Sequence, residues 1–530
     1  MAGPSFELHW VDYVIVLVYF VGVVAHGLHV SQRQERTAES YFLAGRALPW
    51  HLIGLSLYAS NMSGASFVGL MGGTYAHGMV VFNYEWTATV VLAFFAIFML
   101  PSFLRAGVYT VPEFLEHRYD VRCRRAFSLF TLLAIVFIDT AGALYAGGLV
   151  ISLALPHVAL WQAVAVLAVV TGIYTISGGL TAVVVTDAVQ AVLLIAGAAV
   201  IFVLGLREVG GWDALMAGLD PAKTELIKPV DDGFLPWPGL LGVILLGFYY
   251  WTLNQFIVQR ALGARTLDQG RKGAILAGFL KLPNLFLMIL PGLIALALYP
   301  ELERADLAFP ALAFDLLPIG LRGVVAAALI AAIMSSLDSA LNAAGALFTM
   351  DFVKPMRPAA SEAALVATGR VATGLAMVTG AAYAPMLAGF PSLFEYFQSS
   401  LSYIVPPVVV AYLLGLFWSR GTAAAGFWTM ASGLAVGVPI FVAKEITGHW
   451  QAAGLPDLHF TLMSSLIAAA SGLLYVVISM VTAGRGDIAD LLWRPDPKPS
   501  VAAGGSPLGD WRLQVAVMLA ATVGVILWLL

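Results

Sequence analysis

One stretch of the chain, AAIMSSLDSALN at residues 331–342, concentrates small and hydroxyl-bearing side chains. Four of them recur at the i, i+3, i+4, i+7 spacing of one helix face: Ala332, Ser335, Ser336 and Ser339. Oxygen ligands of this kind suit hard cations such as Na⁺, and Asp338 adds a carboxylate. Serines bonded to their own helix are the alternative explanation. The stretch therefore indicates either a cation site or close packing.

A second polar stretch, ASNMSGAS at residues 59–66, interrupts an apolar run. Small and polar residues weaken a helix and permit an unwound turn. Unwound turns persist in membranes only where their free carbonyls line a cavity, and such carbonyls can bind Na⁺. Close packing of helices through small residues is the alternative.

Ionisable residues inside apolar runs are costly and mark functional sites. Six occur here: Glu85, Asp139, Asp187, Lys281, Asp338 and Glu395. We expect structural pairs for Asp139 and Glu395. For Asp187 a salt bridge to a loop arginine is the alternative to a functional role, and for Lys281 it is snorkelling to the membrane surface.

Aromatic residues Tyr249, Tyr250 and Trp251 follow one another in the stretch FYYWTLNQFIVQR, residues 248–260. Aromatic faces suit sugar rings and cations, although such residues also gather at the membrane surface. We find no nucleophile–base constellation and no His/Cys metal cluster, so we expect no enzyme. A net charge of −4 argues against nucleic acid as a partner.

Apolar runs dominate the chain, which is 530 residues long, 60% hydrophobic and only 11% charged. Soluble domains carry about 25% charged residues, so most of this chain belongs in a bilayer. We expect an all-α membrane protein, because runs of about twenty apolar residues mark spanning helices. The fourteen expected helices are 10–30, 51–73, 80–101, 126–152, 158–177, 184–206, 238–258, 273–299, 320–350, 364–384, 393–417, 423–443, 458–482 and 511–530.

The distribution of basic residues predicts the orientation. Most of the 27 Lys and Arg residues, Arg260 among them, fall in alternate loops or adjoining helix ends, which the positive-inside rule places in the cytoplasm. Both termini are then outside, with the chain crossing the plasma (inner) membrane many times. We expect an extracellular loop at 207–237, a turn at Gly178 and Gly179, and a Pro/Gly/Ser-rich cytoplasmic linker at 483–510.

Several stretches together resemble the sodium:solute symporter family, most closely its sodium/glucose cotransporter branch. They are ASNMSGASFVGLMGG (59–73), NYEWTATV (83–90), VYTVPEFLEHRY (108–119), YTISGGLTAVVVTDAVQ (174–190), YYWTLNQFIVQR (249–260), FLKL (279–282), IMSSLDSALNAAGALFTMDF (333–352) and FEYFQSSLSYIVPPVVVAYLLGLFW (394–418). The resemblance implies a LeuT-type inverted repeat of five plus five helices. Its parts would be a leading segment 1–50, repeats 51–206 and 238–417 around the loop 207–237, and added helices in 418–530.

The resemblance also implies two kinds of site. The Na⁺ site would use carbonyls of Ala59, Met62 and Ala332 with hydroxyls of Ser335 and Ser336. A second Na⁺ site would use Asp187, Ser335, Asp338 and Ser339, which predicts two coupled cations. The substrate would contact Asn61, Ser66, Glu85, Tyr250, Trp251, Lys281 and Gln398. Carboxylate, ammonium and amide groups together suit a ligand rich in hydroxyls.

Four positions depart from the family pattern: Ser66 replaces a histidine, Gly247 a polar residue, Asp139 a basic residue and Asp338 a hydroxyl. We therefore expect Na⁺-coupled uptake of a sugar or polyol, an inositol included, by a chain for which a monomer suffices. One alternative is a Na⁺- or H⁺-coupled symporter for a carboxylate or amino acid, with Lys281 as its partner. A sensor or channel is the alternative of another class.

Overall fold

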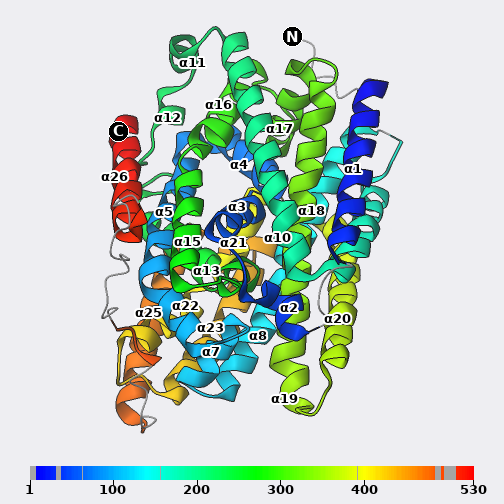
Figure 1. Ribbon diagram of the computed structural model, residues 1–530. Coiled ribbons are helices and arrows are strands. Elements are labelled where there is room, and N and C mark those ends of the chain that lie inside the picture. The colour runs from blue at the N-terminus through cyan, green and yellow to red at the C-terminus, as the bar shows by residue number, and fades with distance from the viewer. Residues whose placement is uncertain are drawn as a thin grey trace.

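The structure, a computed structural model, is an all-helical bundle (Figure 1). It describes the chain except residues 1–7, 32–36, 63, 156, 391, 484–490 and 495–508. The described residues form helices and loops, and none of them belongs to a β-strand. Most of the predicted linker 483–510 lies outside the described residues. The C-terminus, at the end of α26 (Trp511–Leu529), lies toward the end of the bundle that carries α11 (Trp212–Gly218) (Figure 1).

The longer helices follow the apolar runs of the sequence. In the first half they are α1 (Trp10–Ser31), α3 (Trp50–Asn61), α4 (Gly64–His77), α5 (Asn83–Phe94), α7 (Val111–Arg118), α8 (Val121–Ala134), α9 (Ala141–Ala154) and α10 (Leu160–Val209). In the second half they are α13 (Leu240–Thr252), α14 (Gln255–Leu262), α15 (Leu267–Lys281), α16 (Leu290–Leu298), α18 (Leu321–Leu347), α20 (Glu362–Tyr383), α21 (Leu393–Ser402), α22 (Pro406–Phe417), α23 (Ala423–Phe441), α25 (Phe460–Val481) and α26 (Trp511–Leu529).

Eight helices among the described residues are long and apolar enough to cross a membrane, or up to eleven if each bent pair is one span. The apolar face of α20 is exposed at Val371, Leu375 and Val378. Exposed apolar stripes of this kind mark contact with a membrane or another protein. The chain is thus an all-α membrane protein, and the number fourteen stays a prediction.

Helix α10 differs from the expectation, because its backbone is helical through Gly178 and Gly179 where a turn was predicted. It nevertheless folds back. Leu167 of α10 lies near Ile333 of α18, because both flank Gly147 of α9. Gly197, also in α10, faces Val325 of α18. A straight helix from residue 167 to 197 would cover about 45 Å, but residues 325–333 cover about 12 Å. The chain therefore reverses within α10, so this segment passes the bundle twice.

Two helices break near the middle of the bundle. Helix α3 ends at Asn61, and Met62 leaves the helical region with φ −79° and ψ 58°. Helix α13 ends at Thr252, and the side chain of Asn254 then accepts a hydrogen bond from the Phe256 amide to start α14. Asn is a favoured N-cap, which explains why a new helix begins there. The α13–α14 pair is bent by 48°.

Helix α18 lies at the centre, buried along most of its length. It packs against α10, α20, α1 and α3, and so touches both predicted repeats. Its abundance of Ala, Ser and Gly allows those backbones to approach closely. The hydroxyl stripe of the sequence is therefore carried by a helix that is enclosed along most of its length.

Candidate substrate and cation site

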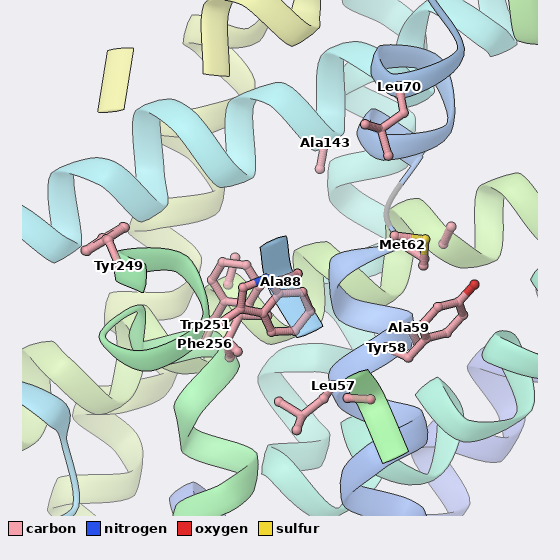
Figure 2. Packing of buried hydrophobic residues seen from close by; sticks show 14 of the residues in the cluster. Leu57, Tyr58, Ala59, Met62, Leu70, Ala88, Ala143, Tyr249, Trp251 and Phe256 are labelled. Carbon is pink, nitrogen blue, oxygen red and sulfur yellow. The ribbon is translucent and has the colours of Figure 1, made fainter. Parts of the chain in front are cut away.

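A cavity of about 150 Å³ lies beside the break between α3 and α4. This space holds roughly five water molecules at about 30 Å³ each, or one solute of about monosaccharide size. Of the residues labelled in Figure 2, Leu70, Ala143, Trp251 and Phe256 line this cavity, and Ala59 and Met62 mark the end of α3 beside it. All seven residues expected to bind substrate lie on its wall: Asn61, Ser66, Glu85, Tyr250, Trp251, Lys281 and Gln398.

Glu85 of α5 and Lys281 of α15 form an ion pair on this wall. The Lys281 Nζ–Glu85 Oε2 distance is 2.6 Å, and both side chains are almost fully buried. Lys281 also donates to the Asn61 Oδ1 at the end of α3. Snorkelling of Lys281 to the surface is therefore wrong, because the buried carboxylate holds the ammonium in place.

Two side chains that the sequence analysis missed support this pair. Asn284 Nδ2 donates to Glu85 Oε2 at 2.5 Å, and Tyr58 donates to Asn284 Oδ1 at 2.8 Å. Asn284 follows Pro283 in the bend between α15 and α16. The sequence could have indicated Asn284, because it is a polar residue directly after a proline within a predicted helix. A proline bends a helix and leaves polar groups near the bend available for contacts.

Aromatic rings form the wall between the two broken helices. Trp251 and Tyr250 make an edge-to-face contact with centroids 5.3 Å apart, and Phe256 lies 5.8 Å from Tyr250. The Lys281 ammonium lies 5.5 Å from the centroid of the Trp251 ring. These aromatics therefore face the cavity and do not form a belt at the membrane surface.

The predicted Na⁺ residues meet where the end of α3 touches α18. Ser336 Oγ is 3.2 Å from the carbonyl oxygen of Ser60 and 3.1 Å from that of Ala332. Ala59 and Met62, which flank this contact, are fully buried. A helix end leaves carbonyls without helical donors, and Ser66 Oγ donates to that of Asn61 at 2.5 Å. The donor set is thus made of oxygens, as Na⁺ requires.

Asp187 of α10 joins the other hydroxyls into a second cluster. Its carboxylate accepts from Ser335 Oγ and, at 2.5 Å, from Ser56 Oγ. Arg260 Nη2 lies 3.0 Å from Asp187 Oδ2, and the same nitrogen donates to Ser339 Oγ. Two of the four residues of the predicted second Na⁺ site, Asp187 and Ser339, therefore contact one guanidinium, and Ser335 joins them through the Asp187 carboxylate.

The fourth residue of that predicted set, Asp338, is bonded elsewhere. Thr175 Oγ1 donates to Asp338 Oδ1 at 2.5 Å, on the first pass of α10. Both Thr175 and Asp338 are buried. The structure therefore brings Asp187, Ser335 and Ser339 together, and gives Asp338 a separate hydroxyl partner.

Arg260 corrects the sequence analysis, which placed it at a cytoplasmic helix end. Its side chain is fully buried, and its Nε donates to Ser56 Oγ at 2.6 Å. The signal was Asn254, because a capping residue after an apolar run announces a new helix rather than a loop. Arg260 then belongs to the half-helix α14 and faces inward.

The two acids expected in structural pairs behave differently. Glu395 Oε1 lies 3.3 Å from His77 Nε2, as expected. Asp139 instead lines the cavity, with the Asn254 side chain as its hydrogen-bond neighbour. No basic residue in the described part of the chain forms an ion pair with it. For Asp139 the structural-pair expectation is therefore wrong.

Comparison with known proteins places the chain in a family. The family model for the sodium:solute symporter family matches residues 41–433. The chain is 34% identical to sodium/glucose cotransporter 4 of Mus musculus, covering 93% of this chain and 78% of that protein. It is 34% identical to a sodium/glucose cotransporter of Vibrio parahaemolyticus, covering 80% and 83%. It is 35% identical to a sodium/mannose cotransporter of Bos taurus, covering 88% and 86%.

Solved structures show the same fold. A Na⁺-coupled sialic acid symporter in a substrate-bound outward-open state superposes with a TM-score of 0.78 at 22% identity, covering 90% of this chain and 99% of that one. A nucleobase-cation-symport-1 family transporter gives 0.51 at 13% identity, covering 83% and 93%. Both have the LeuT-type fold. The match over most of its length shows that this chain belongs to the sodium:solute symporter family.

Proposed function

We propose that the protein takes up a sugar or polyol together with Na⁺ by alternating access across the plasma membrane. One observation carries the proposal: Ser60 and Ser336 line the cavity and also contact each other at the oxygen cluster. A cation bound there would pull the end of α3 against α18 and thereby fix one wall of the cavity. Relatives named for sodium with glucose or mannose support this reading.

In this proposal the coupling ion is held by carbonyls of Ala59, Met62 and Ala332 and by hydroxyls of Ser335 and Ser336. Both hydroxyls now donate to protein oxygens. Rotation about the Cα–Cβ bond turns their lone pairs toward the ion, because a serine hydroxyl both donates and accepts. Ser335 would then exchange the Asp187 carboxylate for the cation.

The substrate hydroxyls would exchange hydrogen bonds with the polar wall. Glu85 accepts, Lys281 donates, and the amides of Asn61 and Gln398 do both. Tyr250 and Trp251 offer ring faces to the sugar, and Ser66 supports the break at Asn61. Lys281 bonds to both Glu85 and Asn61, so a hydroxyl-rich ligand replaces these bonds rather than leaving the groups unpaired.

Arg260 bears on the number of coupled ions. Its guanidinium contacts the Asp187 and Ser339 oxygens that a second Na⁺ would use. A second cation would have to displace this tethered charge, since two cations repel strongly in a buried site. We therefore favour one Na⁺ for each sugar. A measured flux ratio of two Na⁺ for each sugar would contradict this.

The Glu85–Lys281 pair disfavours the carboxylate or amino-acid alternative. A carboxylate ligand needs a free cation, and here Lys281 is paired at 2.6 Å. The polar groups also surround one central cavity, whereas a channel needs a continuous pore. The fourteen-helix topology with both termini outside, and a monomer as the working unit, belong to the same proposal.

Uptake into proteoliposomes tests the proposed function. The purified protein is reconstituted, and entry of labelled glucose is followed with an inward Na⁺ gradient. Unlabelled glucose, myo-inositol, lactate and proline then compete. We expect competition from glucose or inositol and none from lactate or proline. Competition by lactate or proline alone would contradict the proposal.

A further inference from the structure

The wall of the cavity carries two carboxyl groups and one ammonium group. Glu85, Lys281 and Asp139 are the ionisable acids and bases on its wall. Glu85 and Lys281 neutralise each other at 2.6 Å. Asp139 has the Asn254 amide beside it and no ion-pair partner in the part of the chain that the structure describes. An amide stabilises a carboxylate by hydrogen bonding but does not cancel its charge.

Local structure directs Asp139 at the ligand space. It lies in η4 (Ile135–Thr140), a π-helical turn between α8 and α9. Such turns insert a residue into a helix and gather at functional sites. Asn254 is fixed in turn, because its Oδ1 caps α14 and accepts from the Phe256 amide. The Asp139 carboxylate is thus held at the cavity by a rigid neighbour.

The three charged groups share one aromatic wall. Tyr250, Glu85 and Asp139 line the same cavity, and the Lys281 ammonium lies over Trp251, next to Tyr250. A ligand that fills this cavity would therefore meet both the Glu85–Lys281 pair and the Asp139 carboxyl group. The first suits hydroxyl groups, and the second suits a group with a positive charge.

We propose that the preferred substrate is a sugar or cyclitol that carries a primary ammonium group, which pairs with Asp139. The inference rests on the proposed function and names the substrate class of the same cavity. The hydroxyl groups of such a ligand take the bonds of Asn61, Glu85 and Lys281. Its ammonium group gives the Asp139 carboxyl group the cationic partner that a neutral sugar lacks.

Competition among three matched sugars tests this inference. Na⁺-driven uptake of labelled glucose into proteoliposomes is inhibited with D-glucose, D-glucosamine or N-acetyl-D-glucosamine at a series of pH values from mildly acidic to mildly alkaline, because the amine and the Asp139 carboxyl group must both be charged to pair. We expect glucosamine to bind about tenfold more tightly than glucose, the size of a charged hydrogen bond. N-acetylation removes the charge and should abolish the advantage. Equal affinities for glucose and glucosamine would overturn the inference.

Variants assign the effect to Asp139. Asp139→Asn is expected to remove the preference for glucosamine over glucose, and Asp139→Glu to keep it. Asp213→Asn, on the exposed helix α11, is the matched control and keeps the preference. A preference that survives in Asp139→Asn would overturn the assignment.

Two readouts separate this inference from the proposed function. Equilibrium binding of labelled glucosamine to the purified protein reports sugar binding even in a variant that does not transport. Na⁺-dependent glucose uptake without an amine preference would overturn only the inference. Glucosamine binding without any Na⁺-dependent uptake would overturn the proposed function and keep the inference.

Discussion

At the scale of single residues, the cavity depends on a buried ion pair. Removing water from Glu85 and Lys281 is costly, and their contact repays this only because Asn61 and Asn284 complete the hydrogen bonds. The same groups then offer donors and acceptors to a ligand. The side chains that would bind the hydroxyl groups of a ligand are therefore the same ones that stabilise this buried ion pair.

Glu85→Gln should therefore weaken sugar binding. The change leaves the Lys281 ammonium without its carboxylate and removes a charged acceptor from the wall. We expect the apparent affinity for the sugar to fall roughly tenfold or more, measured from the concentration dependence of Na⁺-driven uptake. Glu225→Gln, which removes an exposed carboxylate paired with the buried Lys228, is the control. An unchanged affinity in Glu85→Gln would contradict the role of the pair.

Ser336→Ala should affect the cation first. The hydroxyl contacts both carbonyls at the junction of α3 and α18. We expect the Na⁺ concentration for half-maximal uptake to rise about fivefold to tenfold, the value of one lost hydrogen-bonding ligand. Ser432→Ala, whose hydroxyl bonds only to its own helix, is the control. A loss of sugar affinity at saturating Na⁺, with unchanged Na⁺ dependence, would place Ser336 with the substrate alone.

Residue types at spaced positions predicted the cavity wall well. Asn61, Glu85 and Lys281 are polar in apolar runs, and lipid gives such groups no partners. The sequence analysis missed Asn284 and Arg260. Asn284 follows the bend at Pro283, and Arg260 lies in the helix that begins after the N-cap residue Asn254. Both depend on where a helix breaks, which single-residue reasoning does not reveal.

At the scale of elements, α1 holds the start of α18. Asp12 Oδ1 accepts from the amides of Gly320 and Gly323 at 2.7 and 2.8 Å. The N-cap residue of α18 is Gly320, which has no side chain to cap it. Asp12 thus serves as the cap from a different helix, and its charge also suits the positive end of the helix dipole.

Asp12→Ala should lower the free energy of unfolding by about 1–2 kcal/mol, the usual cost of a lost cap. Asp12→Asn keeps an acceptor oxygen and should lose less. Thermal unfolding in detergent measures both, with Asp231→Ala on an exposed loop as control. Equal stability of Asp12→Ala and the natural protein would contradict the capping role.

Asp306 ties the loop before α17 (Ala308–Ala311) to the start of α21. Both of its carboxylate oxygens lie 3.4 Å from the Leu393 amide nitrogen. Burial raises the pKa of Asp306 to about 6, against the amide and Arg304, which lower it. The folded protein therefore keeps this proton at a pH where the unfolded chain releases it.

The sign of the pH effect follows from linkage. Because its folded-state pKa is raised, Asp306 contributes less stability as the pH rises from about 4 through about 6. Asp306→Asn lacks the titrating group, so its melting temperature relative to the natural protein should rise across that window. Thermal unfolding at a series of pH values measures the difference. A difference that does not change with pH would contradict this account.

Helix boundaries were predicted where the sequence changes sharply, either at a stretch of small polar residues or at the end of an apolar run. The stretch ASNMSGAS predicted the break after α3, and the run of residues 320–350 predicted α18. The reversal within α10 was expected, but not its helical backbone, because Gly178 and Gly179 weaken a helix without excluding it. Tertiary contacts with α18 and α9 override that local preference.

At the scale of the whole molecule, the number of ions sets the limit of accumulation. One charge crossing 100 mV contributes about 2.3 kcal/mol, and a tenfold Na⁺ gradient adds about 1.4 kcal/mol. One ion then supports roughly 500-fold accumulation of a neutral sugar, and two ions would square that limit. A charged amino sugar adds its own response to the membrane potential.

We expect one Na⁺ to enter with each sugar, because Arg260 already neutralises Asp187. Initial rates of labelled Na⁺ and labelled glucose entry, taken from the same proteoliposomes, give the ratio. Asp338→Asn should leave this ratio unchanged, since Asp338 is bonded to Thr175. A ratio that falls from two to one in Asp338→Asn would restore the second site of the sequence analysis.

The family and fold were readable from sequence because the motifs lie on the elements that meet at the cavity. The side-chain contacts within the site could not be predicted, because they depend on which side chains from distant helices meet there. Arg260 at Asp187 and the unpaired Asp139 emerge only when distant helices are brought together.

The central claim is that the contact between α3 and α18 binds a Na⁺ that drives sugar entry. Uptake of labelled glucose into proteoliposomes, with internal and external Na⁺ replaced by choline at a fixed membrane potential, tests it most directly. The account predicts that uptake falls to the level of protein-free vesicles and returns when external Na⁺ is restored. Uptake at full rate in choline would contradict it.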